Sequence, residues 1–499
     1  MNATKLTASE RIAAFAHAFD TSALSESHWR ACSRSLADTL AVAIAGTGEH
    51  ASQCALRYLD RSAAVWPSDS PHACNGAHLW GTDRVATAET AALFNGISGH
   101  VLDYDDVTVP LRGHPSIALW PALVALAEVR DLPGERLGTA FVVGFEVIGK
   151  LARVMATSHY QKGWHSTATI GLIGASVACS YLLGLDATGI VNAIGLAVAQ
   201  AGGVRENVGT EAKSFQAGHC GAAAVRAVLM AESGFMASAS ALDGPHGYMS
   251  LYGEGQDLTS ALDSLGHAPI ELEHSGIDVK QYPLCYATHR ALDGVLAMRA
   301  EHRLSLADVI HMHIETSRGA LIPLTQHRPQ TGLAGKFSIE YAMAAALSDG
   351  FVRLTSFTDE AVKRPSVQAF FDRITISEAG GSITPRWVEL RLSLGSGHTL
   401  NRRVETLHGS TQDPLSEEEL LLKITDCLAW AASPLDGGRL LEAAYRLRHL
   451  ATREFLNLVA FRPSFMGRAG ISRHGEHDRH REGVDRDADH PHEPVPARP

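Results

Sequence analysis

The first 270 residues carry apolar side chains mainly at the spacing of helices that bury one face or all faces. The run from Arg30 to Gly46 is one such helix, and the glycines at its end are a usual stop signal. From Leu119 to Leu185, alanine and leucine recur at helical spacing, interrupted by turn sequences such as DLPGE. Small residues at this density let helices approach closely. The pattern therefore predicts a compact all-helical bundle.

One stretch of this bundle also has the length of a membrane span. Residues 168–185 (ATIGLIGASVACSYLLGL) are uncharged over about one bilayer thickness. The stretch is, however, rich in alanine, glycine and serine, which suits close packing against other helices. We therefore expect a fully buried helix in the helical core.

Around Leu272 the pattern changes from helices to a mixture of strands and helices. VIHMHIET alternates Ile310, Met312 and Ile314 with polar residues, which is the period of a half-buried strand, and WVELRLSL does the same before a hairpin signal, LGSGHTL. A helical pattern returns near Leu415, and the final residues are too rich in charge and proline to bury a core. We expect a mainly α fold with three parts: a large all-helical domain (residues 1–270 plus 409–465), a smaller inserted α+β domain (271–408) and a disordered tail (466–499).

Composition narrows the classes of function. Hydrophobic residues make up 45% and charged residues 19% of the chain, as in ordinary soluble proteins. The net charge of -11 argues against a nucleic-acid partner. Seven cysteines without a CxxC pair match neither a disulfide framework nor a zinc signature, and the N-terminus lacks the apolar core of a signal peptide. We expect a cytoplasmic protein with reduced thiols, no resident metal and no membrane partner.

An acidic loop, NGISGHVLDYDDVTVPLRGHPS, is the first candidate for a functional site. It holds Asp103, Asp105 and Asp106 close to Arg112 and His114. Crowded acids beside cations shift pKa values, as in many active sites. A loop whose aspartates only cap backbone amides has the same composition. The loop alone fits both interpretations equally well.

Further segments place single cations or proton carriers among small or apolar residues: Tyr160 and His165 in SHYQKGWHSTATIG, Lys213 in GTEAKSFQAG, Lys280 and Cys285 in VKQYPLCYATH, and Lys336 in GLAGKFSIEYA. Each has a structural alternative, such as a lysine that extends to solvent or a tyrosine of the core. A lysine among small residues is nevertheless costly unless it reaches an anion or water. Together with the acidic loop, these residues supply cations for carboxylates and groups for proton transfer.

Five of these blocks follow one another in an order found in a known family. The chain resembles the MmgE/PrpD family in NGISGHVLDYDDV…GHPS, GWHSTATIG, EAKSFQAG, KQYPLCYATH and GKFSIEYA, over about residues 10–460. That family includes 2-methylcitrate dehydratase, cis-aconitate decarboxylase and iminodisuccinate epimerase. The resemblance implies a helical domain with an inserted α+β lid, a homodimer, an active site in the cleft between them, and no metal or organic cofactor.

The resemblance also implies roles for single residues. Positions matching active-site residues of the decarboxylase are Asp103, His114, His165, Lys213 and Lys280, and the acid–base pair of the epimerase matches Tyr160 and Lys280. Three positions depart from these relatives. Cys285 stands where the decarboxylase has histidine, the decarboxylase lacks the tyrosine found at Tyr160, and Gln216 replaces a common histidine. The first two departures count against a cis-aconitate decarboxylase.

We therefore expect a cofactor-independent lyase that removes a proton next to a carboxylate of a di- or tricarboxylic acid, closest to 2-methylcitrate dehydratase. Fixed positive charge would stabilise the enediolate, with Lys280 as base, Tyr160 as acid and Asp103 orienting the cations. The predicted catalytic residues are Lys280, Tyr160, His165 and Asp103, and the predicted substrate-binding residues are His114, Lys213, Arg112, Cys285 and Lys336. The alternatives are an epimerase of an iminodisuccinate-like substrate, a cis-aconitate decarboxylase, and a carboxylate-binding protein without catalysis.

Overall fold

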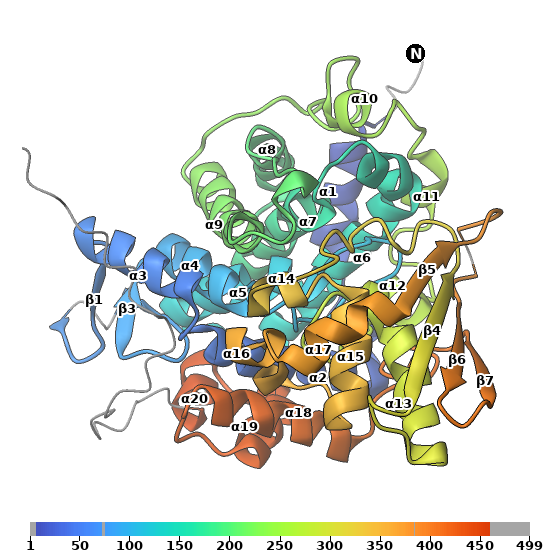
Figure 1. Cartoon of the computed structure of the whole chain (residues 1–499). Coiled ribbons are helices and arrows are strands. Elements are labelled where there is room, and N and C mark those ends of the chain that lie inside the picture. The colour runs from blue at the N-terminus through green and yellow to red at the C-terminus, as the bar shows by residue number, and fades with distance from the viewer. Residues whose placement is uncertain (1–5, 72–74, 384, 460–499) are drawn as a thin grey trace, which may run out of the picture. The chain divides into compact units, whose positions relative to one another are not determined.

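Long helices form the larger part of the fold (Figure 1). The structure, a computed structural model, describes residues 6–71, 75–383 and 385–459, so the predicted tail at 466–499 lies outside the described residues. The main helices of this part are α1 (Ala8–Ala18), α2 (Glu26–Gly46), α3 (His50–Arg61), α4 (Ala88–His100), α5 (Pro115–Arg130), α6 (Gly134–Gln161), α7 (Ser166–Leu183), α8 (Ala187–Val198) and α9 (Ala212–Glu232). Three short helices follow: α10 (Tyr248–Tyr252), α11 (Thr259–Asp263) and α12 (Glu271–His274).

Helix α7 lies at the centre of this part and packs against α5, α6, α8 and α9. It is the helix of the described residues that is long and apolar enough to cross a membrane, and 89% of it is buried inside the protein. Its serines and threonines turn inward onto backbone carbonyls, as Ser176 and Ser180 do four residues back. The predicted buried helix is therefore confirmed.

Glycines set the distance between α4 and α9. A side-chain carbon on Gly96 would lie 2.6 Å from the backbone of Gly218, and one on Gly218 would lie 2.3 Å from the carbonyl oxygen of Leu93. The two helices therefore touch backbone to backbone, which only glycine permits. This contact brings the loop after α4 next to the start of α9, and both segments carry residues predicted to be functional.

The chain returns to the helical part at its C-terminal side. The helices there are α18 (Glu417–Trp430), α19 (Gly437–Tyr445) and α20 (Thr452–Leu458). Helices α18 and α19 pack on α2, and α20 packs on α5 and α6. Figure 1 shows these red helices beside the blue α2, although about 380 residues separate them in sequence. Leu420, Ile424 and Cys427 of α18 join the same apolar core as α2.

The second part is α+β, as predicted. Its sheet has the order β5–β4–β6–β7, with β4 parallel to β5 and the other neighbours antiparallel. The strands are β4 (Val309–Thr316), β5 (Ile374–Glu378), β6 (Val388–Leu394) and β7 (Thr399–Val404). The helices of this part are α13 (His289–His302), α14 (Gly332–Gly335), α15 (Ile339–Asp349), α16 (Asp359–Val362) and α17 (Pro365–Phe370). The predicted hairpin is the pair β6–β7.

The first residues of β4 differ from the predicted alternation. Met312 and Ile314 are buried, but Ile310 is 55% exposed. The register of β4 against β6 shifts between Val309 and His311. Such an irregularity adds a residue to one strand and turns its side chain away from the expected face. The prediction that Ile310 shares a buried face with Met312 and Ile314 was therefore wrong.

The helical part also contains a small sheet that the apolar pattern did not predict. Its antiparallel strands are β1 (Val65–Pro67), β2 (Ala77–His78) and β3 (Arg84–Ala86), in the order β1–β3–β2. These strands have two or three residues each, which is too short for alternation to be visible in the sequence.

The two apolar cores meet in a short connecting segment. Val279 belongs to the core of the helical part and Tyr282 to the core of the α+β part. Lys280 lies between them and is 1% exposed. This predicted functional lysine is therefore buried where the two parts join.

Candidate active site

Three helices of the helical part begin at the same place. His114 is the N-cap of α5, His165 is the N-cap of α7, and Lys213 is the second residue of α9. These three helices pack against one another. Helix N-termini present free N–H groups and a partial positive charge. The N–H groups at these three helix starts and the Lys213 ammonium together form a site suited to binding an anion.

Asp103 is the negative centre of this region. Lys213 Nζ lies 2.5 Å from Asp103 Oδ1, Lys280 Nζ lies 3.2 Å from the same oxygen, and His114 Nε2 lies 3.7 Å away. Burial alone would raise the pKa of Asp103, but the two lysines hold it well below its ordinary value. The pKa of Lys213 is raised, because Asp103 and Asp105 outweigh the effect of burial. Asp103 is therefore ionised, and it orients cations rather than removing protons.

The backbone at Asp103 is held in an unusual conformation by lysines. Asp103 has φ +51°, in the left-handed region that non-glycine residues seldom adopt. Lys280 Nζ donates to the carbonyl oxygen of Asp103 at 2.6 Å, and Lys336 Nζ donates to that of Leu102 at 2.7 Å. Lys423 of α18 donates to the carbonyl oxygen of Tyr104 at 2.9 Å. Three consecutive carbonyls are thus bound by lysines from distant segments, which stabilises the strained loop.

Lys336 was predicted to bind substrate, but both of its observed hydrogen bonds go to the backbone. Its Nζ also donates to the carbonyl oxygen of Pro283 at 2.6 Å, and its own carbonyl oxygen accepts from Cys285 N at 3.0 Å. Burial lowers the pKa of Lys336 to about 7. Lys336 therefore ties the acidic loop to the first residues of the α+β part, a positioning role.

Asp105 lies next to two histidines. His100 Nδ1 forms a hydrogen bond of 2.7 Å with Asp105 Oδ2, and His114 Nδ1 lies 3.0 Å from the same oxygen without hydrogen-bond geometry. A carboxylate only accepts, so Nδ1 of His100 carries the proton and its Nε2 is an acceptor when the ring is neutral. Burial lowers the pKa of His100 to about 4 and also lowers that of His114. These histidines are therefore neutral hydrogen-bonding groups near pH 7, not fixed cations.

His165 joins the same group of rings. Its ring stacks on that of His100 with 5.7 Å between centroids. Burial, together with His100 and Lys213, lowers the pKa of His165 well below its ordinary value. His165 Nδ1 and Gln216 Oε1 are buried polar atoms without a well-formed hydrogen bond in the described chain, although the Gln216 side chain is near enough to His165 to raise its pKa. Unpaired buried acceptors and donors at this point are suited to a ligand or water.

Tyr160 and Cys285 form the adjoining part of the site. The Tyr160 hydroxyl makes no hydrogen bond within the described residues, and burial raises its pKa. Burial likewise raises the pKa of the Cys285 thiol to about 11. Cys285 is close enough to interact electrostatically with Tyr160 and with Asp103, Lys280 and Lys213. The structure thus brings the predicted residues together, although Tyr160 and Lys280 do not contact each other by hydrogen bond.

The cavity at the ion pair is very small in this structure. It is lined by His100, Asp103 and Lys213 of the helical part and by Leu333 and Phe337 of the α+β part. Its volume is about 20 Å³, which is room for about one water molecule. Access for a larger molecule therefore requires that the two walls move apart.

Two groups of side chains in the described residues have the ligand types of a metal site. One is His100, Asp105 and His114, whose facing atoms are already at hydrogen-bond distance. A cation there would have to replace the Nδ1 proton of His100. The other is a more exposed group of His50, Cys54 and Glu211. The absence of a resident metal stays a prediction.

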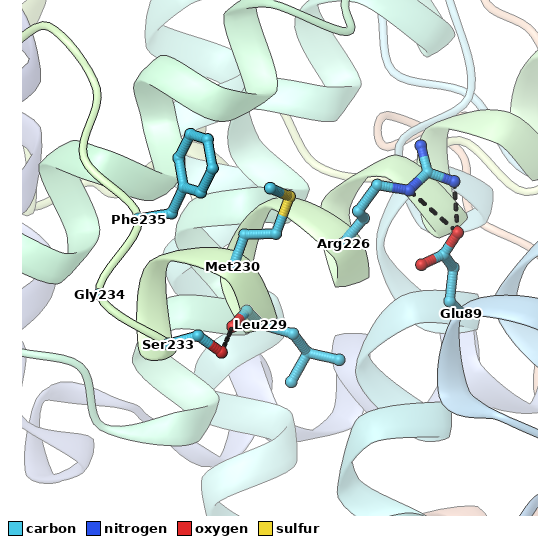
Figure 2. Close-up of a pocket in the computed structure, with 7 residues that line it drawn as sticks. All are labelled: Glu89, Arg226, Leu229, Met230, Ser233, Gly234 and Phe235. Carbon is cyan, nitrogen blue, oxygen red and sulfur yellow. Dashed lines mark hydrogen bonds and ion pairs between the residues drawn. The ribbon is translucent and has the colours of Figure 1, made fainter.

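A larger surface pocket lies at the other end of α9 (Figure 2). Its residues are Glu89, Arg226, Leu229, Met230, Ser233, Gly234 and Phe235. Arg226 is used in a hydrogen-bonded ion pair with Glu89. The rise of an α-helix puts Arg226 about 20 Å from Lys213 along α9. This pocket has no proton carrier comparable to the Lys213–Asp103 region, so we place the candidate site at the latter.

Sequence reasoning missed several residues of the site. His100 belongs to the acidic-loop motif, but the sequence does not show that it is buried and hydrogen-bonded to Asp105. Lys423 had a signal, because it interrupts the apolar run LLLKI of α18; it binds Asp38 as well as the loop. Arg205 and Arg386 had no signal in the sequence, since only the fold brings them near Tyr160.

Comparison with known proteins shows the family of the chain. A model of the MmgE/PrpD N-terminal domain matches residues 10–261, and a model of the MmgE/PrpD C-terminal domain matches residues 282–446. The chain belongs to the MmgE/PrpD family. The second matched region begins two residues after Lys280, near the point where the two apolar cores meet.

Relatives in the MmgE/PrpD family include cis-aconitate decarboxylases. The chain is 29% identical to that of Mus musculus over 82% of this chain and 84% of the relative. It is 27% identical to that of Homo sapiens over 78% and 80%, and 24% identical to that of Aspergillus terreus over 67% and 73%. These relatives are lyases of a carboxylic acid. The homodimer and the cytoplasmic location stay predictions.

Proposed function

We propose that this MmgE/PrpD protein is a lyase that removes a proton from the carbon next to a carboxylate of a di- or tricarboxylic acid. The observation that carries the proposal is the buried Lys213–Asp103–Lys280 cluster at the meeting N-termini of α5, α7 and α9. Proton loss beside a carboxylate builds up negative charge on its oxygens. Fixed cations and N–H groups in a region closed to water stabilise that charge most strongly.

The proposed roles follow from charge and position. Lys213 is held protonated and supplies fixed positive charge, and the neutral rings of His114 and His165 offer hydrogen bonds to carboxylate or hydroxyl groups. When substrate enters, Lys280 separates from Asp103 and gives up its ammonium proton to solvent, and the neutral amine then takes the proton from the substrate carbon. Tyr160, whose hydroxyl is unused, donates a proton to the leaving group.

We propose a hydro-lyase of the 2-methylcitrate dehydratase type as the specific reaction. The C–H bond breaks to Lys280, a C=C bond forms, and hydroxide leaves the neighbouring carbon as water with the proton of Tyr160. Two residues support this choice. The decarboxylase has histidine at the position of Cys285, and it lacks a tyrosine at the position of Tyr160. A cis-aconitate decarboxylase is the second candidate, supported by the similarity to enzymes of that name. An epimerase would use the same two proton carriers and return the proton to the opposite face.

The test is a substrate panel followed by NMR in deuterium oxide. The purified protein is given 2-methylcitrate, citrate, cis-aconitate and iminodisuccinate. Alkene formation supports the dehydratase, carbon dioxide release the decarboxylase, and deuterium exchange without net conversion the epimerase. Binding without any of these would indicate a carboxylate-binding protein and contradict the proposal.

Variants connect the reaction to the proposed residues. Lys280→Met keeps most of the side-chain volume and should lower turnover by at least about 10³-fold, while Tyr160→Phe should lower it about 10²–10⁴-fold. Lys363→Met on the exposed surface of the α+β part is the matched control. Circular dichroism checks that each variant is folded. Near-normal turnover in Lys280→Met would remove Lys280 from the mechanism. Cys285→His should increase carbon dioxide release if this position separates the two reactions.

A further inference from the structure

A group of arginines surrounds Tyr160 where the two parts of the protein meet. The guanidinium carbon of Arg205 lies 4.3 Å, and that of Arg112 5.8 Å, from the centre of the Tyr160 ring. Arg205 also donates to the carbonyl oxygen of Tyr160 at 2.7 Å. Arg386 is near enough to interact electrostatically with both Tyr160 and Arg112.

Among the described residues, these arginines have no acidic partner. Arg112, Arg205 and Arg386 form no ion pair with any acidic side chain of residues 6–71, 75–383 or 385–459. In contrast, Arg364 in the α+β part binds both carboxylate oxygens of Asp349. Burial lowers the pKa of Arg112, and the charge of Arg386 lowers it further. Partly buried positive charges without a counter-charge are costly in the free protein.

The three arginines come from three separate segments. Arg112 follows the acidic loop and has φ +51°, a conformation seldom seen outside glycine. Arg205 follows the bridge between Trp164 and Val204, next to His165. Arg386 precedes β6 in the α+β part. Like charges therefore face each other across the junction, and an anion bound between them would pull the two parts together.

We infer that Arg112, Arg205 and Arg386 bind a second carboxylate of the substrate, beside Tyr160. This inference rests on the proposed function and specifies its substrate class. The Cys285 thiol interacts electrostatically with Tyr160 and with Asp103, Lys280 and Lys213, so the arginine group and the Lys213–Asp103–Lys280 cluster are near the same side chain. The substrate is thus an acid with carboxylates at both ends, one held at the helix N-termini and the other by guanidinium groups, which bind carboxylates in a two-pronged geometry.

Calorimetric titration with two inert acids tests the inference. Tricarballylate carries three carboxylates. Methylsuccinate is the same acid without one of the terminal carboxylates. Arg386→Ala and Arg205→Ala should weaken tricarballylate binding at least about tenfold, since a hydrogen-bonded charge pair contributes about that much. The preference for tricarballylate over methylsuccinate should shrink by the same factor. Arg391→Ala, an exposed arginine of β6 bound only to Asn401, is the matched control.

Each outcome separates the arginine site from the proposed reaction. Unchanged tricarballylate binding in both variants would overturn the arginine site, and so would the lack of tricarballylate binding by the unaltered protein. Turnover in the substrate panel would then still support the lyase. Arginine-dependent binding without turnover of any panel acid would support the arginine site and contradict the lyase. Thermal melts show that the variants remain folded.

Discussion

Lys213 Nζ lies 2.5 Å from Asp103 Oδ1, and this buried ion pair joins the start of α9 to the loop after α4. The same oxygen lies 3.2 Å from Lys280 Nζ. The Asp103 carboxylate is thus shared by two lysines. Lys213 comes from α9, and Lys280 comes from the segment that connects the helical and α+β parts. In the proposed reaction the excess positive charge attracts a substrate carboxylate, and Asp103 keeps both lysines in place beforehand.

Removing the charge of Asp103 should destabilise the fold strongly. Asp103→Asn leaves the buried ammonium groups of Lys213 and Lys280 without this counter-charge. The free energy of unfolding, measured with urea, should therefore decrease by about 3–5 kcal/mol. Adding Lys213→Met should recover part of this loss, because it removes one of the uncompensated charges. Asp359→Asn, which removes an exposed partner of Lys363, should change stability by less than about 1 kcal/mol. Strictly additive losses in the double variant would show that the two residues are not coupled.

The glycine contact between α4 and α9 should tolerate no side chain. Gly218→Ala puts a carbon 2.3 Å from the carbonyl oxygen of Leu93, so the helices must separate. We expect a loss of about 1–3 kcal/mol in unfolding free energy and a larger relative loss of activity, because Lys213 moves away from Asp103. Gly48→Ala, where no atom lies within 4 Å of the added carbon, is the control. Full stability of Gly218→Ala would contradict the close helix contact.

Lys336 should make stability depend on pH above neutrality. Its folded pKa of about 7 lies below its ordinary value, so between pH 7 and about 10 the unfolded chain binds a proton that the folded chain has released. The contribution of Lys336 to the free energy of unfolding therefore rises with pH over that interval. It is lowest below pH 7. Between pH 7 and 9.5, the free energy of unfolding of the unaltered protein should rise by on the order of a few kcal/mol more than that of Lys336→Met. Urea unfolding at several pH values measures the difference; a constant difference would refute it.

Substrate binding should change the separation of the helical and α+β parts. The cavity of about 20 Å³ between Lys213 and Phe337 holds about one water molecule, so a tricarboxylate enters only from an open form. Bound carboxylates then neutralise cations on both walls and favour closure. Small-angle scattering should show compaction on adding tricarballylate. An unchanged scattering profile would indicate a rigid site with another entrance.

Much of the fold could be predicted because its signals are local. Helical spacing and small residues predict the bundle and the buried α7, and alternation predicts β4 and β6. The failures have local causes too. The exposed Ile310 results from a register shift against β6, and the strands of the small sheet are too short to alternate.

The sequence by itself determined the family and the residue types at the site. Four of the five ordered motifs carry Asp103, His114, His165, Lys213 and Lys280, and the structure brings these residues together. Tertiary structure alone decided what each residue does there. Lys336 binds backbone carbonyls, His114 and His165 are neutral, and Arg205 and Arg112 lie over the Tyr160 ring. The physical reason is that hydrophobic periodicity acts between neighbours in sequence, whereas pKa values and ion pairs depend on burial and on distances across the folded chain.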